Sequence, residues 1–402
     1  MPASLAIFSA TQTCRACRLN PEQRSFDDPL THTDALCALT IPYCPDSVPE
    51  GLFDRAMREI SLFHLQHTPG YERWLQANGL DAQLLESLDD WSRLPPIFAN
   101  YFKRRLLSNP AGEGALELTS SGTSGQKSRM RYDARSMAAA QGMVSHIFRH
   151  YGWDTPDSPC NYLLLSYEPE AAISLGTAYT DQFLCSYAPV NRVAYGLRLT
   201  GKGHAFDLFG VVRALQEFAE EGLPVRILGF PAFLSHVLQH MDDTGLADLK
   251  LPTESLVFLG GGWKTQAAQE IPLSQLYQRI NRQLGIVLSR CRDGYGAVEH
   301  AVPYVQCAHQ HFHVPIYSKV FVRSPADFSV QPYGQRGLLE FVSPYISSSP
   351  AHAVVMGDLA TLHPGDTCGC GLATDWFELH GRAATTASRS CAMAASELIG
   401  GA

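Results

Sequence analysis

The sequence contains no apolar run approaching the roughly 18 residues that a membrane-spanning helix needs. It also lacks a basic excess: 31 Lys and Arg stand against 39 Asp and Glu, and a net charge of −8 attracts neither nucleic acid nor anionic lipid. Residues 1–10 have neither the basic region nor the long apolar region of a signal peptide. These absences predict a soluble, cytoplasmic protein without a membrane span or a nucleic-acid partner.

The cysteines lack the pattern of a disulfide scaffold. There are 11 of them, an odd number in a chain of 402 residues, and disulfides are rare in a reducing compartment. Cys14 and Cys17 form one Cys-x-x-Cys pair, but no second pair follows at zinc-finger spacing. Metal binding, thiol chemistry and simple burial therefore remain as explanations for the cysteines.

From Leu116 onwards, short apolar segments alternate with amphipathic helical patterns. This alternation predicts βαβ units, a largely parallel sheet and an α/β fold. We expect a variable, loop-rich lead-in over residues 1–45, a core domain over 46–382 and a short tail over 383–402. The predicted strands are 162–165, 226–229, 255–259 and 337–342, and the predicted helices are 49–65, 135–151, 206–221, 231–241 and 266–284.

Residues 119–128 read Thr-Ser-Ser-Gly-Thr-Ser-Gly-Gln-Lys-Ser. Glycines let a backbone approach a ligand closely, and consecutive amides with hydroxyl donors form an anion-binding turn. The spacing is not that of a Walker loop, and the alternative is a flexible Ser/Gly linker. We interpret the segment as a phosphate-binding loop whose ligand-contacting residues are Thr119, Ser120, Ser121, Gly122, Thr123, Ser124, Gly125 and Lys127.

This loop resembles the phosphate signature of the adenylate-forming superfamily of acyl-CoA synthetases, peptide-synthetase adenylation domains and luciferases. Its serine-rich form, with Gln126, Lys127 and Ser128, resembles the LuxE family of acyl-protein synthetases. The resemblance implies the N-terminal domain of such an enzyme, with layered mixed sheets and helices, which activates a carboxylic acid with ATP and Mg²⁺. We expect the usual mobile C-terminal domain to be absent, because the chain is short after Arg382 and has no lysine after Lys319.

A second segment, residues 293–300, has the aromatic-Gly-x-x-Glu form of the superfamily's acidic turn. An aromatic ring can stack on adenine, and a carboxylate is a hard oxygen ligand for Mg²⁺. By resemblance, Tyr295 and Gly296 flank the adenine and Glu299 holds magnesium. Val298 replaces the usual threonine that touches the α-phosphate, so His300 is the candidate substitute.

Three further motifs follow the same order as in the superfamily. Gly261 and Gly262 follow a predicted strand and resemble the floor of the adenine pocket. Asp358, in a Gly-Asp pair, resembles the carboxylate that accepts the ribose hydroxyls. Arg382, in a Gly-Arg pair, resembles the hinge arginine that reaches ribose or phosphate.

Two clusters of soft ligands predict a structural zinc site. Zinc of this kind prefers four Cys or His ligands in a closed tetrahedral arrangement. Cys368 and Cys370 lie in a glycine-rich turn, and Cys307 precedes three histidines. A Cys₃His site resembles one found in some relatives of phenylacetate-CoA ligase, and the Phe-His-Val context favours His313. The alternative is that these side chains are simply buried or exposed.

The acyl group of an acyl-AMP needs an acceptor, and a thiolate is an effective nucleophile. In LuxE-like enzymes a cysteine close to the C-terminus accepts the acyl group and passes it to a reductase partner, and Cys391 matches that placement. The alternatives are a buried structural cysteine, a phenylacetate-type ligase that uses free CoA, and a nucleotide-binding scaffold without turnover. A long-chain fatty acid is implied only by the family, and homo-oligomerisation is left open.

Overall fold

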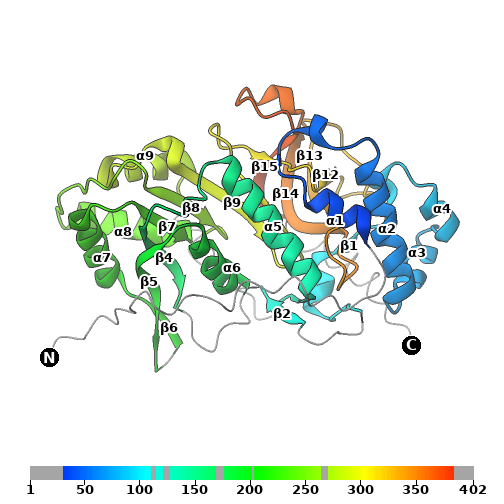
Figure 1. The fold of residues 1–402 in the computed structure, drawn as a ribbon, viewed down its shortest axis with the longest axis horizontal. Helices are drawn as coiled ribbons and strands as arrows, with labels where there is room; N and C mark the ends of the chain where they lie inside the picture. The colour runs from blue at the N-terminus through cyan, green and yellow to red at the C-terminus, as the bar shows by residue number, and fades with distance from the viewer. Residues whose placement is uncertain are drawn as a thin grey trace. The chain divides into compact units, whose positions relative to one another are not determined.

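The computed structural model describes residues 30–109, 115–120, 127–168, 176–201, 203–263 and 270–383 (Figure 1). Within them the chain divides into two compact units. Unit 1 comprises residues 152–295, and unit 2 comprises residues 30–151 together with 296–383. Among these residues no helix is both long enough and apolar enough to cross a membrane.

Unit 1 is built on a sheet with the strand order β9-β8-β7-β4-β5-β6. All neighbouring strands are parallel except the antiparallel pair β5–β6. The predicted βαβ pattern is thus confirmed in this unit. Its strands are β4 (Cys160–Tyr167), β5 (Val190–Thr200), β6 (Gly203–Phe206), β7 (Val225–Gly229), β8 (Leu256–Gly260) and β9 (Cys291–Ala297, of which the last two residues fall in unit 2), and its helices are α6 (Gly176–Leu184), α7 (Leu208–Glu221), α8 (Pro231–Asp243) and α9 (Leu273–Leu284), with 3₁₀ turns at Cys185–Tyr187 and Leu288–Arg290.

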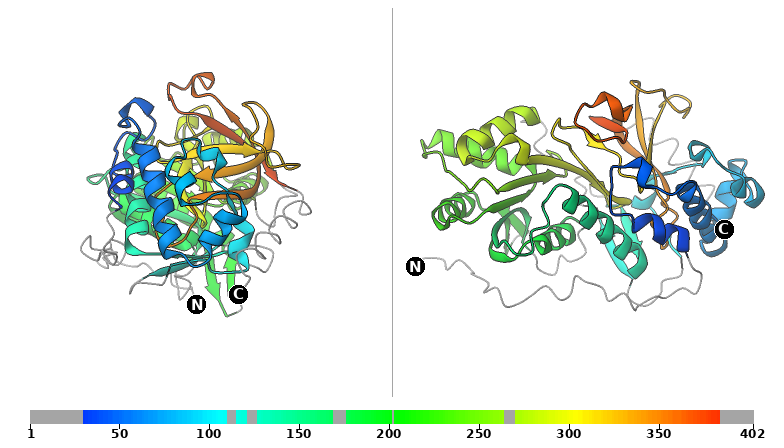
Figure 2. Two further views of the ribbon diagram at one scale, coloured as in Figure 1. Left: turned by 90° about the vertical axis from the view of Figure 1, so that its right-hand side faces the viewer. Right: turned by 45° about the horizontal axis from the view of Figure 1, so that its top comes forward.

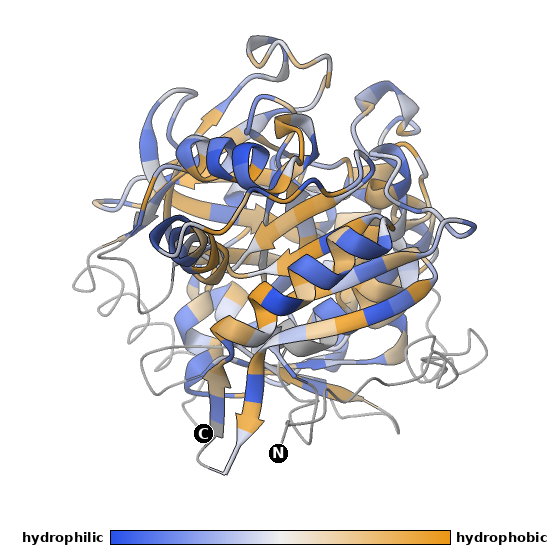
Figure 3. Ribbon diagram, turned by 90° about the vertical axis from the view of Figure 1, so that its left-hand side faces the viewer, coloured by the Kyte–Doolittle hydropathy of each residue, from blue (hydrophilic) through white to orange (hydrophobic). Residues whose placement is uncertain are grey.

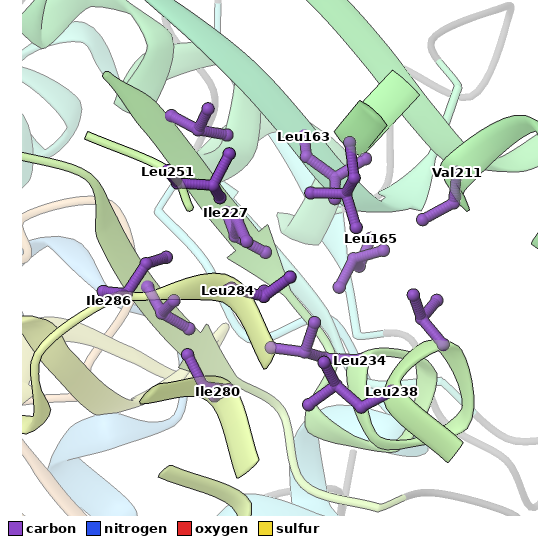
Figure 4. Close-up of a cluster of buried hydrophobic side chains, with 14 of the residues drawn as sticks. Leu163, Leu165, Val211, Ile227, Leu234, Leu238, Leu251, Ile280, Leu284 and Ile286 are labelled. Atoms are coloured by element: carbon purple, nitrogen blue, oxygen red, sulfur yellow. The ribbon is translucent and has the colours of Figure 1, made fainter. Parts of the chain in front are cut away.

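The core of unit 1 lies between the sheet and helices α7, α8 and α9 (Figure 4). Helix α9 shows why these segments are helical: Leu276, Tyr277, Ile280 and Leu284 recur at helical spacing and are all buried. The helix ends where Gly285 adopts the left-handed conformation, with φ of 73°. Figure 3, which colours each residue by hydropathy, shows that the helices carry both hydrophilic and hydrophobic residues, as expected for amphipathic helices.

Unit 2 contains a mainly antiparallel sheet with the strand order β11-β15-β14-β13-β12, of which β12 to β15 are the orange to red-orange strands in Figure 2. Strand β1 pairs parallel to β14. A separate two-stranded ribbon is formed by β2 and β3. The elements are α1 (Thr31–Cys37), α2 (Leu52–His67), α3 (Tyr71–Ala77), α4 (Ala82–Glu86), β1 (Ile97–Phe98), β2 (Leu116–Thr119), β3 (Arg129–Tyr132), α5 (Ala134–His150), β10 (His300–Val305), β11 (Phe312–His313), β12 (Lys319–Arg323), β13 (Arg336–Val342), β14 (Ala353–His363) and β15 (Trp376–Arg382), with 3₁₀ turns at Pro45–Ser47, Trp91–Arg93, Ala99–Lys103 and Gly365–Thr367.

The expectation of a largely parallel sheet is wrong for unit 2. Strands β12 to β15 follow one another without intervening α-helices, so neighbours run antiparallel instead of being joined by a helical crossover. The predicted helix 266–284 is also too long, because residues 270–272 are not helical and α9 begins after Pro272. The other predicted helices and all four predicted strands are confirmed to within a few residues, and part of the expected lead-in forms α1.

A buried ion pair joins two strands of unit 2. Arg323 Nε lies 2.5 Å from Glu340 Oε2, and Arg323 also donates to the carbonyl oxygens of Ser92 and Phe328. Burial raises the pKa of Glu340 to about 7, although the guanidinium of Arg323 opposes this shift. Because the pKa of Glu340 is higher in the folded protein than in the unfolded chain, the free energy of unfolding falls as the pH rises from the ordinary pKa of a glutamate towards about 7.

We expect Arg323→Met to lower the free energy of unfolding by about 3–5 kcal/mol at pH 8.5, because it leaves a buried carboxylate unpaired. The loss should be smaller at pH 5.5, where Glu340 can take up a proton. Urea denaturation at both pH values measures the difference. The double variant Arg323→Met/Glu340→Leu is the control and should recover most of the stability. An equal loss at the two pH values would contradict this account.

Candidate functional site

The predicted phosphate loop connects β2 and β3, and its two ends are hydrogen-bonded to each other. The amide of Ser120 donates to the carbonyl oxygen of Ser128 over 3.0 Å, and the amide of Ser128 donates to Ser120 Oγ over 2.9 Å. Lys127 is exposed, and Thr119 ends β2. The remaining predicted contacts, Ser121, Gly122, Thr123, Ser124 and Gly125, lie outside the described residues.

Glu299 lies in the turn between β9 and β10, and its side chain is 5% exposed. Burial raises the pKa of this carboxyl, whereas Ser128, Lys103 and Arg382 lower it. A buried carboxylate is costly without positive charge nearby, and a divalent cation would favour the ionised form. Glu299 therefore fits the predicted role of a magnesium ligand.

Lys103, in the 3₁₀ turn Ala99–Lys103, is a charge that the sequence analysis missed. It acts on the Glu299 carboxyl and is half-buried. No motif surrounds it, since it follows an ordinary Tyr-Phe pair. Only the fold shows that a lysine from this turn contributes to the electrostatics of the acidic turn.

His300 is buried, with 1% of its surface exposed. Its Nε2 lies 2.9 Å from Tyr304 Oη, and its ring stacks on Phe341 with a centroid distance of 4.6 Å. Burial lowers the pKa of His300 to about 3, so the ring is neutral at physiological pH. A role in contacting the α-phosphate remains a prediction, and any such contact would come from a neutral imidazole.

Asp358 and Arg382 lie opposite each other on the neighbouring strands β14 and β15. Arg382 Nε is 3.5 Å from Asp358 Oδ1. The arginine side chain is 76% exposed and the aspartate 16% exposed, so both can still reach a ligand. The sheet thus brings together two residues that the sequence linked only by motif order.

The adenine-binding candidates Gly261, Gly262 and Tyr295 belong to unit 1. Gly261 and Gly262 follow β8 with φ of 78° and 65°, values that residues with a Cβ rarely adopt. A Cβ at Gly262 would meet no atom within 4 Å, so the backbone borders open space. Tyr295 is half-buried near the end of β9, and the adjoining Gly296, in unit 2, is exposed. This open glycine turn at the carboxyl end of a parallel strand is typical of a ligand-binding edge.

The four predicted zinc ligands lie together in unit 2. The ligand atoms of Cys307, His313, Cys368 and Cys370 are all within 4.8 Å of one another. Cys307 Sγ is 3.6 Å from Cys368 Sγ, and Cys370 Sγ is 3.2 Å from His313 Nε2. Three thiols and one imidazole at these separations match the donor set of a structural zinc ion.

Hydrogen bonds to neighbouring groups orient His313 and Cys307, as is usual for the ligands of a metal ion. His313 Nδ1 is 2.8 Å from the carbonyl oxygen of Thr374, which leaves Nε2 free to act as a ligand. The amide of His309 donates to Cys307 Sγ over 3.3 Å. His311 Nδ1 lies 3.2 Å from Cys368 Sγ, so this ring borders the cluster without belonging to it. None of the cysteines in the described parts of the chain forms a disulfide.

Cys391 lies outside the described residues, as do Cys14 and Cys17. The geometry therefore bears on the adenylation motifs and the Cys/His cluster, and the acyl-accepting role of Cys391 remains a prediction.

Comparison with known proteins identifies a family for most of the chain. A family model described as "Acyl-protein synthetase, LuxE" matches residues 46–399. The fold is similar to that of 2-hydroxyisobutyryl-CoA ligase in an open conformation in complex with 2-HIB-AMP and CoA, with a TM-score of 0.62, 14% identity, and coverage of 91% of this chain and 75% of that one. The same ligase in the postadenylation state with 2-HIB-AMP gives a TM-score of 0.59 at 15% identity, covering 91% and 73% of the two chains.

At these identities the solved structures establish the fold alone, and a search of the curated proteins found no match. The family model, in contrast, spans most of the chain, including the phosphate loop, the acidic turn and Asp358. The chain therefore belongs to the LuxE family of acyl-protein synthetases and is an adenylate-forming ligase.

Proposed function

We propose that this ligase converts a long-chain fatty acid and ATP into an acyl-AMP, transfers the acyl group to Cys391 and then passes it to an acyl-reductase partner. Membership of an acyl-protein synthetase family, over a matched range that includes Cys391, is the observation that carries the proposal. The donor set of the site supports the first step: hydroxyls and Lys127 for phosphates, and Asp358 with Arg382 for ribose.

In the first half-reaction a carboxylate oxygen attacks the α-phosphorus and pyrophosphate leaves. The side chains position the reactants and stabilise charge, since no covalent bond to the protein forms in this step. Glu299 would hold Mg²⁺, which neutralises phosphate charge when bound. In the second half-reaction the Cys391 thiolate attacks the acyl carbon and AMP leaves, so that a thioester replaces the mixed anhydride.

A CoA ligase is the second candidate, because the fold is similar to that of 2-hydroxyisobutyryl-CoA ligase solved with CoA. In that reaction free CoA would replace Cys391 as the acceptor. The two candidates share the adenylation step and differ only in the thiol that takes the acyl group.

Acid-dependent exchange between ATP and pyrophosphate across a panel of carboxylic acids tests the adenylation step. We expect Asp358→Asn to raise the KM for ATP by about 10- to 100-fold, because a charged hydrogen-bond acceptor for ribose is lost, while the KM for the acid stays unchanged. Asp89→Asn, at an exposed aspartate, is the matched control. Exchange that no acid stimulates would refute the adenylation proposal.

Cys391→Ser should leave pyrophosphate exchange intact and abolish hydroxylamine-sensitive labelling of the protein by radioactive acid. Cys44→Ser, at a half-buried cysteine of unit 2, controls for the loss of a thiol and should label normally. Undiminished labelling of Cys391→Ser would rule out Cys391 as the acceptor. CoA-dependent release of AMP that is unchanged in this variant would favour the CoA ligase.

We also propose that the Cys307, His313, Cys368 and Cys370 cluster holds a structural zinc ion. We expect the purified protein to carry about one zinc per chain, measured by elemental analysis, since four such ligands complete one tetrahedral site. Cys370→Ser should lose the metal and melt at a lower temperature, as should the native protein after treatment with a chelator. Cys44→Ser again serves as the control, and a native protein free of zinc with unchanged melting in Cys370→Ser would contradict the proposal.

A further inference from the structure

The β2–β3 ribbon, which carries the phosphate loop, pairs with no other strand in the described part of the chain. A two-stranded ribbon is only marginally stable alone, so side chains must hold it in place. Its last residue, Tyr132, is 1% exposed, and its hydroxyl contacts the acidic turn. The ribbon is thus anchored at its base, next to Glu299.

Two buried tyrosine hydroxyls form a chain of hydrogen bonds there. Tyr132 Oη donates to the carbonyl oxygen of Val298 over 2.7 Å, and the amide of Ala301 donates to Tyr345 Oη over 2.7 Å. The two hydroxyls are 3.3 Å apart. Each carries a single proton and that of Tyr132 is already donated, so Tyr345 must donate to Tyr132.

Val298 precedes Glu299, and Ala301 follows His300. The two tyrosine hydroxyls therefore link the backbone before Glu299 to the backbone after His300. Burial raises the pKa of Tyr345 to about 12 and raises that of Tyr132 well above its ordinary value. Both hydroxyls therefore keep their protons at physiological pH, and the direction of donation does not change.

The segment that supplies Tyr345 also holds the neighbours of Tyr132. Ser348 Oγ donates to the carbonyl oxygen of Arg131 over 2.6 Å, and Ser347 Oγ donates to Asp133 Oδ2 over 2.8 Å. Asp133 in turn caps helix α5 by accepting from the amide of Ser136 over 2.7 Å. Residues 131–133, at the end of the ribbon, are thus each hydrogen-bonded to residues 345–348, which lie between β13 and β14.

We propose that Tyr132 and Tyr345 are positioning residues that fix the Glu299 carboxylate relative to the phosphate loop. This inference rests on the proposed adenylation function. Neither hydroxyl needs to touch the substrate, because the pair ties the backbone on both sides of Glu299 to the ribbon that grips the phosphates. Displacement of a catalytic group by about 1 Å can cost on the order of 100-fold in rate, so such a tie matters for turnover.

Tyr345→Phe tests the proposal, because it removes one hydroxyl and keeps the buried ring. We expect the Mg²⁺ concentration that half-saturates pyrophosphate exchange to rise roughly ten-fold, the effect of losing one buried hydrogen bond. The KM for the acid should not change. Tyr132→Phe should behave in the same way, and it keeps the test decisive if the first variant folds poorly.

Tyr71→Phe is the matched control. This tyrosine is also buried in unit 2, and its hydroxyl is 2.7 Å from His352 Nε2. Loss of that contact should affect melting without changing the Mg²⁺ dependence. The double variant Tyr132→Phe/Tyr345→Phe should be worse than either single variant but by less than the product of their effects, since each single variant already breaks the Tyr132–Tyr345 link and keeps one of the two backbone hydrogen bonds.

The outcomes separate this inference from the function on which it rests. If the native protein shows no acid-dependent exchange, the proposed function fails. If the native protein exchanges and Tyr345→Phe and Tyr132→Phe retain the native Mg²⁺ dependence, the function stands and the positioning role is wrong. If the fold-changes in half-saturating Mg²⁺ concentration of the two single variants multiply in the double variant, the two hydroxyls act independently, and this would also contradict the proposed linkage.

Discussion

The burial of the Glu299 carboxylate is the constraint on which the arrangement of the side chains around the β9–β10 turn depends. A carboxylate that is 5% exposed is unfavourable unless positive charge or hydrogen-bond donors compensate it. Lys103, Arg382 and Ser128 provide that compensation from three separate segments of the chain. Strand β15, which carries Arg382, and Ser128, at the end of the predicted phosphate loop, must therefore lie near the turn that holds Glu299.

The two units contain different kinds of sheet, and each sheet presents different chemical groups. In unit 1 the parallel strands end in a glycine turn at Gly261 and Gly262, where the backbone itself borders open space. In unit 2 the antiparallel pair β14–β15 sets Asp358 opposite Arg382, so polar side chains are presented in a defined register. Unit 1 thus presents open backbone at the end of a parallel strand, and unit 2 presents a pair of charged side chains from two antiparallel strands.

The Cys/His cluster depends on loop geometry more than on sheets. Gly369 and Gly371 adopt positive φ angles of 72° and 92°, which lets Cys368 and Cys370 turn towards the same point. Cys307 and His313 approach from a segment that begins more than 50 positions earlier, and Thr374 orients the imidazole. A bound ion would join these two segments of the chain.

By itself, the sequence determined the class of chemistry and the positions of the local elements. The composition of residues 119–128 indicates phosphate binding, Cys368 and Cys370 with Cys307 and His313 indicate a metal site, and the apolar spacing places the strands and helices. The tertiary structure decided what distant residues do together. Lys103 acts on Glu299 without any motif, and Tyr132 meets Tyr345 across 213 positions. Such contacts depend on how sheets and loops close around a buried charge, and local spacing carries no signal for them.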